Sequence, residues 1–101
     1  KIYFLSSQLG SIGDNTSGGM YIYRSSKTAL NQVVKSLSVD LKPMGITVIS
    51  LHPGWVKTDM GGPNAPVQID ESIKGMMQVI DKTDIRDTGR FLNYDGKELP
   101  W

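Results

Sequence analysis

The sequence contains no cysteine, so it can form neither a disulfide framework nor a thiolate metal site. It has a single histidine, His52, and therefore lacks the histidine cluster of a typical zinc site. No apolar run approaches the roughly 20 residues that cross a bilayer. The apolar opening over residues 1–5 is too short for a signal peptide. These absences argue against a metal centre and a membrane anchor, and they favour a cytoplasmic protein.

The sequence also has no large excess of either sign of charge. Eleven basic and ten acidic side chains give a formal net charge of +1, and the two signs are interspersed. Nucleic acid or an anionic membrane is therefore not the expected partner. With 39% hydrophobic and 21% charged residues, the composition is typical of a globular protein, and 101 residues fit one domain at most.

The first apolar run, residues 2–5, is continuous rather than alternating. This pattern is typical of a strand that is buried on both faces of a parallel sheet. Such a strand needs neighbours on both sides. We therefore expect residues 1–101 to be a partial single domain, the C-terminal half of a larger one, with an open edge at its first strand.

A helical period follows. Apolar residues recur at steps of three and four, which predicts an amphipathic helix over residues 21–41: Ala29, Leu30, Val33, Val34, Leu37 and Leu41. Pro43 and Gly45 end it. Residues 46–51 are rich in β-branched side chains and predict a second strand. Strand, long helix and strand form a βαβ unit with parallel strands and a right-handed crossover.

The remainder predicts one more helix and one more strand. Residues 61–66 resist regular structure and are expected to be mobile, and residues 70–80 show a helical pattern with Met76 and Met77 on its apolar face. We interpret the two methionines as core packing rather than a binding surface. Residues 90–94 predict a third strand. The pattern of strands and helices predicts an α/β fold with a parallel sheet.

Tyr23 and Lys27 are the first candidates for chemistry. Positions four apart share one face of a helix, so the phenol and the ammonium can lie side by side. A phenol ordinarily has a pKa of about 10, and a neighbouring cation favours the phenolate. The pair could act as an acid/base device. The spacing alone also fits a half-buried tyrosine beside a solvated lysine.

Position in the fold favours the chemical interpretation. Ligands of open α/β sheets bind beyond the carboxyl ends of the strands. Ser7 follows the first strand, a loop follows Leu51, and the helix that carries Tyr23 and Lys27 begins on the same edge. The glycine-rich loop over residues 8–19 matches no phosphate-binding motif. It is either a flexible connection or one wall of a substrate site.

These residues resemble the short-chain dehydrogenases/reductases, and within that family the sniffer and C-factor group of carbonyl reductases. The similarity is carried by residues 6–10, by Tyr23-Arg24-Ser25-Ser26-Lys27, and by the turn over residues 52–60. It extends to residues 93–96 and to Pro100-Trp101, so it covers essentially the whole chain. The resemblance implies the fold class α/β, with these residues as the C-terminal part of a doubly wound parallel-sheet, NAD(P)-binding Rossmann fold.

The resemblance implies a role for each matching residue. Tyr23 exchanges a proton with the substrate oxygen while hydride moves to or from the nicotinamide. Lys27 holds the ribose hydroxyls and keeps the phenol acidic, and Ser7 orients the substrate carbonyl. The implied cofactor contacts after the second strand are Pro53, Gly54, Val56 and Thr58. Residues 60–67 then form part of a substrate lid. His52 is interpreted as a turn residue rather than a base.

The resemblance also implies the partners. The expected cofactor is NADP or NAD, with NADP slightly favoured, and the substrate is a small carbonyl or alcohol. A homodimer through the helix over residues 21–41 is expected, as in many members. The family's glycine-rich dinucleotide loop and the asparagine of its tetrad have no counterpart here and are expected upstream of Lys1. Residues 14–17 lengthen the substrate loop beyond the common spacing.

Two alternatives to the enzyme stay open. One is a non-catalytic relative that binds nucleotide and works as a regulator or scaffold. The other is an interaction module formed by these residues alone.

Overall fold

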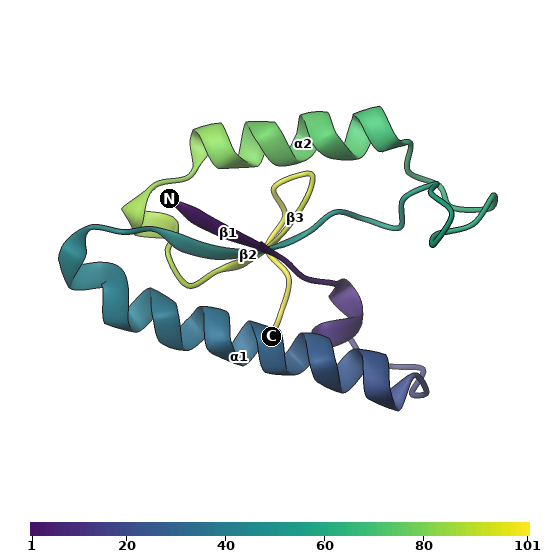
Figure 1. Ribbon diagram of the computed structural model, residues 1–101, viewed down its shortest axis with the longest axis horizontal. Coiled ribbons are helices and arrows are strands. Elements are labelled where there is room, and N and C mark those ends of the chain that lie inside the picture. Colours follow the sequence, from purple (N-terminus) through teal and green to yellow (C-terminus); the bar gives the residue numbers. More distant parts are fainter.

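A computed structural model describes all 101 residues as three layers, with a parallel sheet between two helices (Figure 1). The sheet has the order β1-β2-β3. Helix α1 covers one face and α2 the other. The bounds are β1 Ile2–Leu5, α1 Tyr21–Leu41, β2 Val48–His52, α2 Ile69–Lys82 and β3 Phe91–Asn93, with 3₁₀ turns η1 Gln8–Gly10, η2 Lys42–Met44 and η3 Ile85–Asp87. The α/β prediction and the βαβ unit with parallel strands are confirmed.

Strand β2 is the centre of the sheet. It pairs with β1 in the register Ile2↔Val48 and with β3 in the register Ser50↔Phe91. Residues 48–51 are buried. The expected open edge at the first strand is confirmed, because β1 pairs with β2 alone. The expected burial on both faces is not found in residues 1–101: no residue of β1 is fully buried, and Leu5 is 58% exposed.

Helix α1 has the predicted bounds, but its sheet-facing side is more polar than the predicted apolar stripe. Its buried residues are Asn31, Val34 and Ser38. Oγ of Ser50 on β2 donates to Oδ1 of Asn31 at 2.8 Å, so a polar pair lies under the helix, although Nδ2 of Asn31 is buried without a partner. The predicted apolar stripe is confirmed in part: Val34 is buried and Leu30, Leu37 and Leu41 are half-buried, whereas Ala29 and Val33 are exposed. The spacing of apolar residues alone could not locate the side of α1 that contacts the sheet, because part of that side is polar.

The ends of the other elements differ slightly from the prediction. The second strand begins later than expected, at Val48. It also ends later, because His52 still pairs with Asn93 of β3. Helix α2 extends past both predicted ends, and β3 is shorter than predicted. After α1, the chain turns as predicted through η2 and through Gly45 at φ 71°.

The main apolar core lies between the sheet and α2. It consists of Ile49, Leu51, Val79 and Leu92, with Tyr3 and Met76 packed against it. The prediction of core packing is therefore confirmed for Met76. It is wrong for Met77, which is 60% exposed because it follows Met76 by one position and turns away from the sheet.

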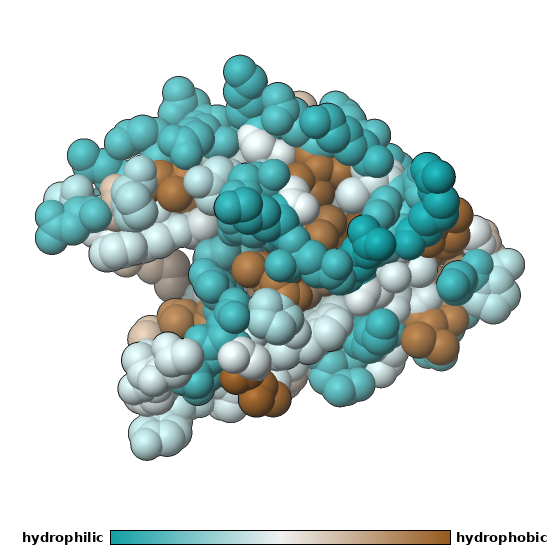
Figure 2. Space-filling model, turned by 180° about the vertical axis from the view of Figure 1, so that it is seen from behind, coloured by the Kyte–Doolittle hydropathy of each residue, from teal (hydrophilic) through white to brown (hydrophobic).

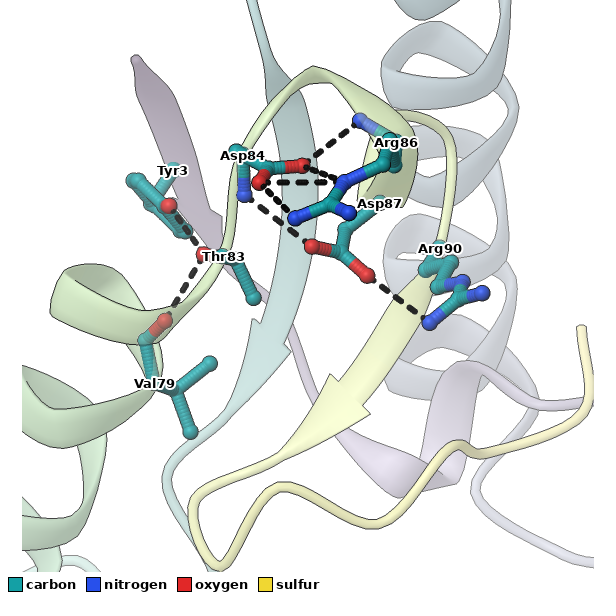
Figure 3. A network of polar contacts seen from close by, with 7 residues as sticks. All are labelled: Tyr3, Val79, Thr83, Asp84, Arg86, Asp87 and Arg90. Carbon is teal, nitrogen blue, oxygen red and sulfur yellow. Dashed lines mark hydrogen bonds and ion pairs between the residues drawn. The ribbon is translucent and has the colours of Figure 1, made fainter.

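A polar network closes the amino edge of the sheet (Figure 3). Tyr3 of β1 hydrogen-bonds Thr83 after α2. Next to it, the carboxylate of Asp84 accepts from the guanidinium of Arg86 at 2.6 Å, and the carboxylate of Asp87 accepts from the N–H of Asp84 at 3.0 Å. The Arg86 side chain holds the pKa of Asp84 at about 2. The network fixes the turn into β3 at the edge opposite the candidate site. Neither long helix is apolar enough over a sufficient length to cross a bilayer.

Candidate functional site

The candidate site lies at the carboxyl edge of the sheet. Strand pairing continues past β1, since the N–H of Ser6 donates to the carbonyl of Leu51 at 2.9 Å. Turn η1, the start of α1 and the loop after β2 all gather at this end of the molecule (Figure 1). Seen from behind, this end carries a hollow between the loop after β2 and the start of α1 (Figure 2). The predicted site segments therefore meet on one rim.

Ser7 is the N-cap of η1 and lies directly before its first residue, Gln8. Its Oγ accepts from the N–H of Leu9 at 3.1 Å, and only 8% of the residue is exposed. A serine hydroxyl that accepts one bond retains its hydrogen for donation to another group. Ser7 is thus held at one place with a donor to spare.

Tyr23 and Lys27 lie in the first two turns of α1. Nζ of Lys27 is 5.8 Å from the centroid of the Tyr23 ring, within the range of a cation–π contact. The predicted adjacency of the two side chains is confirmed. The ion pairs of the structure join Arg86 to Asp84 and Arg90 to Asp87, so the Lys27 ammonium has no carboxylate partner.

The turn of Ser7 is pressed against the helix at Lys27. A Cβ built on Gly10 would lie 2.8 Å from the main-chain carbon of Lys27, closer than any side chain tolerates. Oγ1 of Thr28 donates to the carbonyl of Gly10 at 2.8 Å, and the N–H of Gly10 donates to the carbonyl of Ser7 at 2.8 Å. Gly10 is therefore the connection between the serine and the Tyr23–Lys27 pair.

The turn after β2 holds the next predicted residues. Oγ of the buried Ser72 on α2 donates to the carbonyl of Pro53 at 2.6 Å. Gly54 has φ 89°, and a Cβ there would lie 2.8 Å from the ring of Tyr94. Pro53 and Gly54 are thus fixed against α2 and the segment after β3, and no side chain could replace the glycine without moving Tyr94.

Val56 and Thr58 belong to a closed loop. Val56 bridges Val67 in parallel, and the N–H of Lys57 donates to the carbonyl of Val67 at 2.7 Å. Oγ1 of Thr58 accepts from the N–H of Gly61 at 3.1 Å. These bonds close the base of the loop. Its predicted part as a mobile substrate lid stays a prediction.

Three polar residues at this edge make hydrogen bonds that the sequence did not predict. Nδ1 of His52 accepts from the N–H of Gln8 at 3.1 Å, and burial lowers the pKa of the imidazole. The interpretation of His52 as a turn residue is wrong, because it is the last residue of β2. The second is Ser72. The third is Arg24, whose Nη2 donates to Oγ of Ser17 at 3.1 Å and joins the long loop to α1.

No local signal marks these three residues. His52 and Gln8 are far apart in sequence, and nothing near either one indicates the other. Ser72 was detectable only as a small polar residue on the inner face of an amphipathic helix. Arg24 lies inside the Tyr23–Lys27 segment, but its contact depends on the path of the loop.

Comparisons with known proteins agree on one family. Residues 1–68 match the family model described as short chain dehydrogenase. C-signal of Myxococcus xanthus is 48% identical over 101 residues, which is all of this chain and 61% of that protein.

Solved structures agree as well. The carbonyl reductase Sniffer of D. melanogaster superposes with a TM-score of 0.96 at 56% identity, over 99% of this chain and 40% of that one. The NADPH-bound carbonyl reductase from chicken fatty liver gives a TM-score of 0.91 at 42% identity, over 99% of this chain and 42% of that one. The chain therefore spans about half the length of the proteins it matches.

Proposed function

The chain belongs to the short-chain dehydrogenase family, and from this premise we propose that the full-length protein is an NAD(P)(H)-dependent oxidoreductase that interconverts a carbonyl and an alcohol. The observation that carries the proposal is the Lys27 ammonium, which lies beside the Tyr23 ring without a carboxylate partner, at the edge where α/β sheets bind ligands. The carbonyl reductases among the solved relatives support this reaction class.

The residues present fit a nicotinamide cofactor. The unpaired ammonium of Lys27 can donate to the ribose hydroxyls, and the main chain of Pro53, Gly54 and Val56 can line the nicotinamide. Oγ1 of Thr58 accepts from Gly61 at 3.1 Å but has only a 3.5 Å contact for its own hydrogen, so that hydrogen can serve the carboxamide or the pyrophosphate. When bound, the nicotinamide supplies or accepts the hydride. NADP is favoured because a solved relative carries NADPH.

Proton transfer falls to Tyr23. In reduction, the phenol donates its proton to the substrate oxygen as charge develops there, and in oxidation the phenolate takes a proton from the alcohol. Lys27 stabilises the phenolate electrostatically. Ser7 donates its free hydrogen to the same oxygen and fixes its orientation.

Replacing Tyr23 tests the proposal. In the full-length protein, Tyr23→Phe is expected to lower kcat for carbonyl reduction by about 10² or more, because the general acid is lost. Tyr21→Phe is the matched control, since Tyr21 lies on the same helix and is 84% exposed. Near-parental reduction by Tyr23→Phe would reject the assignment.

We also propose that α1 forms the seam of a homodimer. Its outward face combines the apolar side chains of Ile22 and Val33, 88% and 51% exposed, with small residues such as Ala29. Val33→Glu is expected to give monomers in sedimentation. Val39→Glu, on another side of the same helix, is the control, and dimers of equal stability in both variants would contradict the seam.

The second candidate function is a nucleotide-binding regulator or scaffold without turnover. The supporting observation is that C-signal, the relative from Myxococcus xanthus, is named as a signal. Binding of NADPH or NADH without oxidation across a broad panel of aldehydes and ketones would favour this function over the enzyme.

A further inference from the structure

We infer that Pro100 and Trp101 form a clamp that positions the serine turn of the site, which consists of Ser7 and η1. The inference rests on the proposed function, because the turn it holds carries Ser7. The clamp joins three parts of the molecule, namely β3, the segment after η1, and the middle of α1.

The clamp is anchored on β3. After the turn that follows β3, the chain runs back antiparallel along its outer edge. The N–H of Asn93 donates to the carbonyl of Lys97 at 2.8 Å, and the N–H of Leu99 donates to the carbonyl of Phe91 at 2.7 Å. The ring of Trp101 then stacks on Phe91, with centroids 5.4 Å apart and planes 25° apart. Phe91 is fully buried, so the indole rests on a rigid base.

From this base the clamp grips the loop that leads to Tyr23. Oγ of Ser11 donates to the carbonyl of Pro100 at 2.6 Å, and the N–H of Ile12 donates to the carbonyl of Trp101 at 2.6 Å. Oγ of Ser11 also accepts from the N–H of Asp14 at 3.0 Å. Ser11 is 1% exposed, so its side chain is buried at this contact, whereas Ile12 beside it is 73% exposed.

Gly13, two residues after Ser11, also packs closely against Pro100. A Cβ built on Gly13 would lie 3.0 Å from Cβ of Pro100. Figure 1 shows the C-terminus beside α1, and Trp101 shares a groove there with Asn31 and Gln32. The last residues therefore lie between the sheet edge, α1 and the loop.

Hydrogen bonds within η1 connect Ser11, which the clamp holds, to Ser7. The N–H of Ser11 donates to the carbonyl of Gln8 at 2.9 Å, and the N–H of Gly10 donates to the carbonyl of Ser7. Gly10 itself abuts Lys27. Any shift of Ser11 is thus passed to Ser7 on one side and to the α1 contact on the other.

The clamp is needed because the rest of the loop has little burial of its own. Every residue from 12 to 22 is exposed, which leaves Ser11 as the buried anchor of the segment. A misplacement of about 1 Å in a catalytic group can cost about 10² in rate. Trp101 and Ser11 are therefore positioning residues, since they act through Ser7 and touch neither substrate nor cofactor.

The test uses the full-length protein and reads local order and catalysis separately. Trp101→Ala removes the stacking, and Ser11→Ala removes the donor to Pro100. Both variants are expected to speed amide hydrogen exchange of residues 9–14 by about tenfold or more relative to the parent. Both are expected to lower kcat for carbonyl reduction by about tenfold, with the affinity for NADPH unchanged.

Two further variants separate positioning from stability. Val79→Ala weakens the core under α2, away from the loop, and is expected to lower the melting temperature without local acceleration of exchange. Trp101→Phe keeps an aromatic ring on Phe91 and is expected to restore both slow exchange and kcat.

The exchange and kinetic measurements test the existence of the clamp and the proposed function separately. Unchanged exchange in both Trp101→Ala and Ser11→Ala, or equal acceleration in Val79→Ala, overturns the clamp. Faster exchange with unchanged kcat overturns its positioning role. If the parent itself reduces no carbonyl compound, the proposed function fails, while the exchange data still report whether the clamp exists.

Discussion

The main-chain N–H of Gln8 donates a hydrogen bond of 3.1 Å to Nδ1 of His52. An imidazole nitrogen accepts only when it carries no proton, so the ring is neutral and its hydrogen is on Nε2. The bond joins the end of β2 to the residue directly after Ser7. The serine turn is thus held by β2 through His52, in addition to its contact with α1 through Gly10.

Acid should release this bond. Burial lowers the pKa of His52 in the folded protein below its unfolded value of about 6.5. The unfolded chain then binds more protons, so stability is highest above pH 6.5 and is lost as the pH falls towards the folded pKa. We expect the melting temperature to fall between pH 7 and 5, and His52→Gln to lose that part of the pH dependence. The same slope in parent and variant would contradict the assignment.

Gly10→Ala should separate the serine turn from α1. The added methyl would meet the main chain of Lys27 at 2.8 Å, and neither backbone can move without shifting the site. We expect a loss of about 1–3 kcal/mol in the free energy of unfolding and a fall in kcat of about tenfold or more. Gly45→Ala is the control, because Gly45 also has a special backbone requirement but lies in open space at the far end of α1. It should lower stability without affecting kcat.

The elements of the fold were predictable because local patterns determine them. The bounds of α1 followed from its period and from Pro43 and Gly45, and the parallel pairing of β1 and β2 followed from the helix between them. The adjacency of Tyr23 and Lys27 was predictable for the same reason, because helical geometry relates residues four apart.

The support of the site was not predictable, because it depends on contacts between distant residues. His52 and Gln8 are 44 positions apart, and Ser11 and Pro100 are 89 apart. No local pattern encodes such a pair. The polar residues on the sheet-facing side of α1, Asn31 and Ser38, were missed for a related reason. A hydroxyl on β2 pairs with Asn31, and a count of apolar residues is blind to that compensation.

Asp84→Asn should change acid stability without changing the site. The Arg86 side chain holds the pKa of Asp84 at about 2, below its ordinary value near 3.8. A depressed carboxyl contributes stability above about pH 4, and this contribution is lost as the pH falls towards 2. We expect Asp84→Asn to be less stable than the parent at pH 7, with the difference shrinking at pH 2 to 3. Equal kcat in both proteins is expected, because this turn lies at the opposite edge of the sheet (Figure 3).

Ser72→Ala should disturb the turn at Pro53 and Gly54, which is proposed to line the nicotinamide, by removing a hydrogen bond from α2. Its Oγ, on a residue only 2% exposed, donates to the carbonyl of Pro53 at 2.6 Å, and alanine supplies no donor in its place. An unsatisfied buried carbonyl costs about 1–3 kcal/mol, so the turn at Pro53 and Gly54 should shift to recover a partner. Because that turn is proposed to line the nicotinamide, KM for NADPH should rise several-fold while Ser7, Tyr23 and Lys27 stay in place. Ser36→Ala, at an exposed position of α1, is the matched control. An unchanged KM in Ser72→Ala, with stability reduced as expected, would show that the turn is structural and that the cofactor is held elsewhere.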